Sequence, residues 1–163
     1  MTVDAGDCRD NLATLITQET ALLNELAGLL AREHDVLVAN DVVALEAAMK
    51  QRQVTLGQLL RVEDERRSLC RMHGHGVDAQ GLERLLAWCD PQGALKALWG
   101  ECAQAATRCR AMNDKNGAFV SARMKRVDAV LGVLTGRGSE PPTYGPRTGY
   151  AAPRSGRMLT TEA

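Results

Sequence analysis

The stretch CRDNLATLITQETALLNELAGLLAREHDVLVA, residues 8–39, decides the fold of this chain. Its apolar residues recur every three or four positions, which is the spacing of one face of an α-helix. They are Leu12, Leu15, Ile16, Leu22, Leu23, Leu26, Leu29, Leu30, Val36 and Leu37. No proline interrupts the run, so we predict one amphipathic helix of roughly 45 Å, at about 1.5 Å per residue. A helix of that length predicts an elongated molecule.

Two carboxylates fall within the apolar seam of this helix. Glu19 and Glu33 occupy the seam positions that Leu12 and Leu26 share. A carboxylate in such a place must reach water, a partner cation or a buried hydrogen bond. We therefore expect these two residues to fix the register of the helix against its neighbour.

A second long helix follows almost at once. Asn40 and Asp41 supply the cap between the two helices. The periodic apolar residues then continue to about Arg71 and are Leu45, Met49, Leu56, Leu59, Val62, Leu69 and Met72. Because the connection is only a few residues long, the two helices should form an antiparallel hairpin. Two glycines in residues 72–76 predict a loop after it.

The rest of the periodic sequence predicts a short helix over residues 77–89 and a third long helix after it. Asp90 is the expected cap, with Pro91 at the first helical position. The long helix should extend to Leu134. Asn113, Asn116 and Gly117 interrupt its apolar stripe, and glycine costs about 1 kcal/mol relative to alanine inside a helix. We expect a dip in local stability there, with either a hinge or the accommodation of a crossing helix as its purpose.

The composition supports an all-α fold. Hydrophobic residues make up 45% of the chain but aromatic residues only 3%, which suits helical seams better than sheets. After residue 135 the sequence becomes rich in Gly, Pro and Arg, a composition that cannot bury enough apolar surface to fold. We predict a helical domain over residues 1–135 and a disordered tail over residues 136–163. The helical domain should be an elongated antiparallel hairpin or bundle of three long helices and one short helix, with coiled-coil-like packing.

Charge and hydropathy argue against several classes of partner. Basic and acidic residues number 20 each and the pI is about 6.8, so the chain lacks the positive charge that nucleic-acid binding requires. No stretch approaches the roughly 20 apolar residues that a bilayer requires. We expect a protein that is not inserted in a membrane and works in the cytoplasm. Its five cysteines have no paired spacing and are expected to be reduced core thiols.

The sequence offers little support for catalysis or metal binding. His73 and His75, with Cys70 nearby, are too few for a four-ligand zinc site. No phosphate-binding glycine loop or nucleophile motif is present. We therefore expect no enzymatic activity, no metal and no cofactor.

The apolar stripe of the third long helix continues beyond any obvious cover from the hairpin or the short helix. An uncovered stripe is typical of a site for a helical partner. Homodimerisation through the same stripe is the alternative, and the residues alone do not decide between the two.

Several of these residues resemble the FlgN family of flagellar chaperones. The hairpin part of the resemblance rests on Leu12, Leu15, Glu19, Leu22, Leu26, Leu29, Glu33, Leu37, Asp41, Leu45, Lys50, Leu56, Leu59, Glu63, Arg66 and Leu69. A more specific part is formed by Asn113, Asn116, Gly117, Phe119 and Val120, followed by Tyr144, Gly145, Pro146 and Gly149. The Arg-rich extension after Gly149 has no counterpart in the family pattern.

The resemblance implies a cytosolic chaperone for the hook-filament junction proteins, usually called FlgK and FlgL. It would bind their C-terminal helical segments, prevent premature self-association and deliver them to the flagellar type III export apparatus. The implied partner-binding residues are Asn113, Asn116, Gly117, Val120, Met124, Val127, Leu131, Leu134, Tyr144 and Gly145. A structural coiled-coil adaptor or homo-oligomer without export clients is the alternative function.

Overall fold

The computed structural model describes residues 4–136 of the chain. Four helices follow one another: α1 (Ala5–Ala39), α2 (Val42–Met72), α3 (Ala79–Cys89) and α4 (Ala94–Thr135). No strand occurs in this range, which confirms the predicted fold of three long helices and one short one. The predicted tail lies outside the described residues, apart from Gly136. The chain divides into two compact units after Arg123, within α4.

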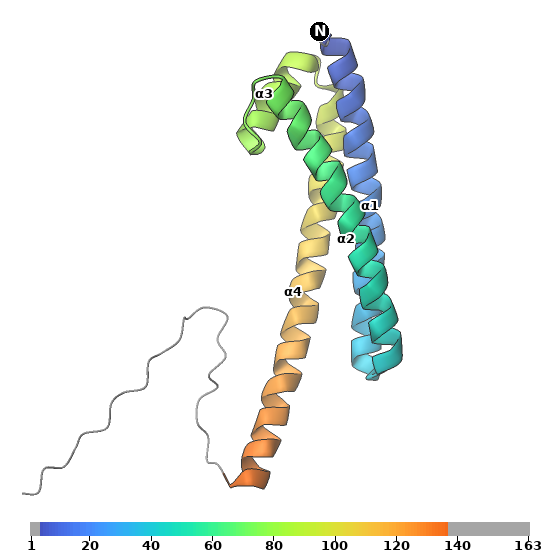
Figure 1. The fold of residues 1–163 in the computed structure, drawn as a ribbon, viewed down its shortest axis with the longest axis vertical. Helices are drawn as coiled ribbons and strands as arrows, with labels where there is room; N and C mark the ends of the chain where they lie inside the picture. Colours follow the sequence, from blue (N-terminus) through green and yellow to red (C-terminus); the bar gives the residue numbers. More distant parts are fainter. Residues whose placement is uncertain (1–3, 137–163) are drawn as a thin grey trace, which may run out of the picture. The chain divides into compact units, whose positions relative to one another are not determined.

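The turn between α1 and α2 uses the two residues that the sequence indicated. Asn40 ends α1 in the left-handed region, with φ 59°, and its N–H donates to the carbonyls of Leu37 and Val36. Asparagine tolerates this conformation better than most residues do. The Asp41 carboxylate accepts a hydrogen bond from the N–H of Ala44 at 3.0 Å and so caps α2. The short, doubly capped turn produces the antiparallel hairpin seen in Figure 1.

The hairpin seam has the alternating four- and three-residue spacing of a coiled coil. On α1 its members are Leu12, Ile16, Glu19, Leu23, Leu26, Leu30, Glu33 and Leu37, and all of them are buried. Glu19 accepts two hydrogen bonds from Arg66 of α2, at 2.9 and 3.4 Å. Glu33 accepts one from Arg52 at 3.1 Å.

These ion pairs specify one alignment of the two helices. Both glutamates lie fourteen residues apart, as do both arginines, so the two pairs fit a single antiparallel register. A slip of one heptad would place Glu19 opposite Leu59 and leave a buried carboxylate without a partner, which is costly. The expected register-fixing role of the two glutamates therefore has a structural basis.

Helix α3 closes the end of the hairpin where α1 begins. Asp78 caps it by accepting a hydrogen bond from the N–H of Gly81 at 2.8 Å. A side chain at Gly81 would collide with the carbonyl of Gly76, so the loop can approach the helix only because this residue is glycine. Leu82, Leu85 and Cys89 of α3 are buried in the shared core.

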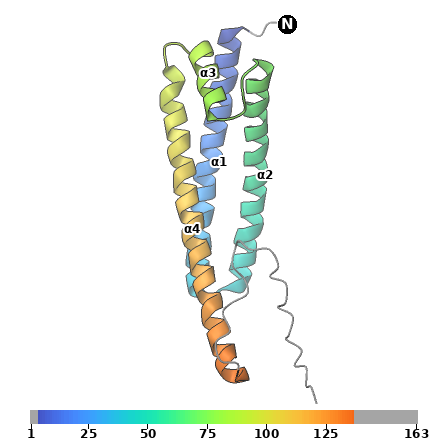
Figure 2. The same ribbon diagram turned by 90° about the vertical axis from the view of Figure 1, so that its left-hand side faces the viewer.

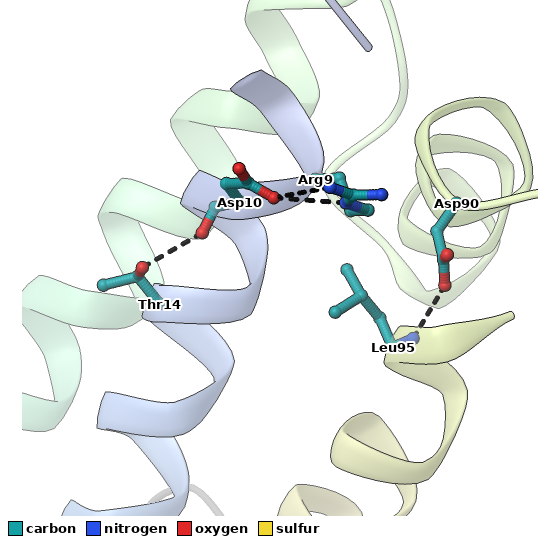
Figure 3. Close-up of polar contacts among 5 residues, drawn as sticks. All are labelled: Arg9, Asp10, Thr14, Asp90 and Leu95. Atoms are coloured by element: carbon teal, nitrogen blue, oxygen red, sulfur yellow. Dashed lines mark hydrogen bonds and ion pairs between the residues drawn. The ribbon is translucent and has the colours of Figure 1, made fainter. Parts of the chain in front are cut away.

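The start of α4 corrects one sequence-based expectation. Pro91 lies in a turn before the helix, which begins at Ala94, so proline is not at the first helical position. Asp90 is nevertheless the cap, because its Oδ2 accepts a hydrogen bond from the N–H of Leu95 at 2.7 Å (Figure 3). The N–H of Gly93, which has φ +73°, donates to the Asp90 carbonyl and closes a turn. Because of this turn, the helix starts three residues after Pro91.

The first part of α4 lies along α1 and runs in the same direction (Figure 2). The Cys109 thiol donates to the Leu23 carbonyl at 3.0 Å, and the Asn116 amide donates to the Leu30 carbonyl at 2.9 Å. Both partners advance by seven residues between these contacts, so the two helices are parallel and in register. The first unit thus contains a core formed by all four helices, with α1 in contact with each of the other long ones.

Candidate partner-binding site

The predicted partner stripe lies on α4 and is exposed. Its members are Val120, Met124, Val127, Leu131 and Leu134, which alternate in spacing between four and three residues. Their exposed fractions are 44%, 58%, 50%, 50% and 75%. Val120 belongs to the first unit and the other four to the second. In the second unit, Met124, Val127, Leu131 and Leu134 therefore form a row of large apolar side chains exposed to solvent.

The asparagine and glycine residues before the stripe do not break the helix. α4 is continuous through Asn113, Asn116 and Gly117. Asn113 and Gly117 are exposed, and a side chain at Gly117 would meet open space. Asn116 is buried, with 4% of its surface exposed. The three residues that the sequence grouped together thus have two different environments.

Asn116 is part of a contact between α4 and the end of α1. Its Nδ2 donates to the Leu30 carbonyl, and its Oδ1 lies 3.0 Å from Nδ1 of His34. Because Oδ1 can only accept, His34 must donate at Nδ1. In this structure Asn116 binds within the protein, whereas the neighbouring stripe is exposed.

An aromatic and cationic contact continues from there. The His34 ring meets the edge of the Phe119 ring at a centroid distance of 5.7 Å, and the Arg123 guanidinium lies 4.8 Å above the same ring. Arg123 also donates to Oδ1 of Asn40 at 3.0 Å. The sequence alone did not indicate that His34, Asn40 and Arg123 take part in this contact. The hydrogen bonds join the end of α1 to α4, between residues 82 and 83 positions apart. Polar residues on two amphipathic helices carry no signal of such a pairing.

The heptad pattern along α4 shifts by one position between Phe119 and Val120. In the first unit α4 carries a series of buried and half-buried residues at strict heptad spacing, which are Leu95, Leu98, Cys102, Ala105, Cys109, Met112, Asn116 and Phe119, with Arg123 next in the series. Trp99 and Gly100 are half-buried beside this series. The exposed stripe begins at Val120 and follows the same spacing one position later. A change of phase of this kind rotates the apolar face around the helix. The stripe is therefore offset by one sequence position from the heptad series of the first unit.

Tyr144 and Gly145, the last two predicted partner-binding residues, lie outside the described residues. None of the helices in the described part of the chain carries an apolar stretch long enough to cross a lipid bilayer.

The cysteine side chains are part of the core. All five are free and buried. Burial raises the pKa of the Cys8 thiol to about 12, and the neighbouring Cys89 thiol adds to the shift. Burial likewise raises the pKa of the other four thiols. Thiols of this kind are poor nucleophiles at neutral pH. Within residues 4–136, no group of three His, Cys, Asp or Glu side chains is arranged to hold a metal ion.

The fold defines a helical-bundle protein with a packed hairpin and an apolar stripe on its last helix. Comparison with known protein families gives a match to FlgN protein over residues 8–152, which is most of the chain. The chain therefore belongs to the FlgN family. Membership indicates a flagellar export chaperone and implies binding to flagellar export substrates. Comparisons with curated proteins and with solved structures gave no match.

Proposed function

We propose that the protein is a cytoplasmic, non-enzymatic chaperone of flagellar type III secretion that binds the C-terminal helical segments of hook-filament junction proteins of the FlgK and FlgL type. By covering these segments it prevents premature self-association and delivers the clients to the export apparatus. The observation that carries the proposal is the exposed stripe on α4. A chaperone for amphipathic helices requires a surface of this kind. Family membership supports flagellar export substrates in general as the clients.

Binding would proceed by packing of apolar side chains. Val127, Leu131 and Leu134 would exchange water for the apolar face of a client helix, and each leucine that becomes buried contributes about 1.5–3 kcal/mol. Met124 is flexible and adapts to imperfectly matched partners. Ordering the client segment on binding opposes this gain by about 2–5 kcal/mol, which keeps the affinity moderate and permits release.

The test compares two aspartate substitutions on the same helix. Leu131→Asp places a carboxylate in the stripe, whereas Ala129→Asp places it on the opposite face of α4, at another exposed position. Titration of a purified hook-filament junction protein, followed by calorimetry, should show at least about a tenfold loss of affinity for Leu131→Asp. Ala129→Asp should bind as the parent chain does.

Two outcomes would contradict the proposal. If both variants bind the client equally well, the stripe is not the client site. If the parent chain binds no junction protein and sediments as a dimer that Leu131→Asp dissociates, the structural homo-oligomer is the better explanation of the same stripe.

A further inference from the structure

Five side chains at the end of α1 and on α4 form a connected set that we name the α1–α4 clamp. They are His34, Asn40, Asn116, Phe119 and Arg123. The buried Asn116 amide contacts His34, whose ring contacts Phe119. Phe119 in turn contacts Arg123, which donates to Asn40 at the end of α1. Every consecutive pair is joined by a hydrogen bond, a ring contact or a cation–π contact. Arg123 is also the residue at which the first unit ends.

The helical segment after the clamp is short and exposed. It extends from Met124 to Thr135, twelve residues, and its large apolar side chains are all at least half exposed. Isolated helices shorter than about 12–15 residues are marginal in water, because nucleation costs more than a few hydrogen bonds return. Because its side chains are exposed, their burial contributes little to the stability of this helical segment. Its helicity must therefore propagate from a stretch of α4 that is already held in place.

We propose that the clamp supplies this anchor, and that His34, Asn116 and Arg123 are positioning residues that keep the client stripe helical before a client arrives. The inference rests on the proposed function, since it assigns a role to residues beside the same stripe. The partner it concerns is the amphipathic client helix, which would meet a preformed row of side chains.

The geometry explains why these residue types are suited to the task. Asn116 donates to a backbone carbonyl of α1 and accepts from His34, so it uses both ends of one buried amide. Leucine at this heptad position would pack but would not fix the axial position of α4. Arg123 joins the ring of Phe119 to Asn40, where the chain leaves α1. The clamp therefore fixes the axial position and the rotation of α4 relative to the end of α1, next to the start of the stripe.

A preformed stripe binds more tightly because less conformational entropy is lost on association. Weakening the clamp should let the last turns of α4 fray, and each binding event would then have to order them again. For Asn116→Ala we expect a loss of client affinity of about fivefold to tenfold. Amide hydrogen exchange in residues 124–134 of the free, full-length chain should become faster by a similar factor.

The control breaks a different hydrogen bond between the same two helices. Arg108 donates to Oδ1 of Asn24 at 3.0 Å in an exposed contact far from the stripe. Asn24→Ala should leave both the exchange of residues 124–134 and the client affinity unchanged. His34→Ala should reproduce the effect of Asn116→Ala, and the double variant should lose no more than either single one. His34→Gln, which restores an N–H donor, should recover part of the affinity.

The inference is overturned if Asn116→Ala accelerates exchange throughout the first unit but leaves residues 124–134 and client affinity as they were. The inference is also overturned if Asn116→Ala raises the affinity for the client, because the clamp residues and the client would then compete for α4. If Asn116→Ala does not fold, Arg123→Ala, at a partly exposed position, provides the same test. Loss of binding in Leu131→Asp without any effect of the clamp variants would refute the clamp alone. Unchanged binding in Leu131→Asp would refute the proposed function.

Discussion

The hairpin seam and the end of α4 have the same sequence pattern and opposite environments. On α1, Leu23 and Leu26 lie three residues apart in the heptad pattern and are each 6% exposed. On α4, Leu131 and Leu134 repeat at the same spacing and are 50% and 75% exposed. Periodicity therefore establishes an apolar face on a helix, whereas only the fold establishes what covers that face.

The largest expected difference between the two regions is the effect of aspartate at a leucine. Leu26→Asp removes a packed side chain and buries a carboxylate without a partner, so we expect a loss of at least about 4 kcal/mol in the free energy of unfolding. Leu131→Asp should change it by less than about 1 kcal/mol. Urea denaturation followed by circular dichroism measures both. Equal losses would mean that the stripe on α4 is buried, for example in a homodimer.

Much of the fold could be predicted from the sequence because its helices are long and strongly periodic. The turn at Asn40 and Asp41 was identifiable since both residues have specific capping roles. The start of α4 was misplaced because Pro91 is acceptable both in a turn and at the first helical position, and only the Asp90 hydrogen bond decides between them. Local signals locate helices well but leave their ends to capping geometry.

The candidate site was only partly accessible to sequence reasoning. The stripe was visible as a row of apolar residues, and its exposure in the structure agrees with the idea of an unfilled face. The separation of Asn116 from Asn113 and Gly117 was not visible, because it depends on the contact with Leu30 and His34. Contacts between residues more than 80 positions apart leave no pattern within one short segment.

The second prediction concerns ion pairs that differ in burial. Arg66 and Glu19 side chains are 12% and 11% exposed, and the Arg66 guanidinium also lies over the Trp99 ring at 5.2 Å. Arg66→Leu leaves a buried carboxylate unpaired and should reduce the free energy of unfolding by about 3 kcal/mol.

Arg67 provides the matched control, because its pair with Glu63 lies on the outer surface of the same helix at 45% and 32% exposure. Arg67→Leu should cost no more than about 0.5 kcal/mol. Adding Glu19→Leu to Arg66→Leu should restore most of the lost stability. A double variant as unstable as the single one would show that arginine packing, and not the unpaired charge, causes the loss.

The third prediction uses the cysteines, all of which lie in the first unit. The pKa of each thiol is higher in the folded chain than the ordinary value of 9.0, chiefly because of burial. The neutral thiols therefore contribute stability that is fully present below pH 9 and is lost as the pH rises toward the raised values. Urea midpoints measured from pH 8 to pH 10.5 should fall.

Cys8 should account for a clear share of that fall, since its pKa is raised to about 12. A Cys8→Ala variant, less stable at neutral pH, should lose less of its remaining stability over the same range. Its helical stripe on α4 contains no cysteine and should show unchanged hydrogen exchange once intrinsic rates are corrected for pH. An identical pH slope in the variant and the parent would contradict the assignment to Cys8.

The smallest expected effects come from the two ends of α4. Asp90→Ala removes a buried cap whose Oδ2 accepts from the N–H of Leu95, and we expect a loss of about 1–2 kcal/mol in global stability. Gly136 ends the helix with φ +65°, a conformation that costs alanine about 1 kcal/mol. Because residues near that end are exposed, Gly136→Ala should accelerate hydrogen exchange only in the last turn, around Val133 and Leu134, and leave the urea midpoint unchanged. If Gly136→Ala lowered the midpoint as much as Asp90→Ala does, the end of α4 would unfold together with the hairpin core, and the contrast between the two regions would no longer hold.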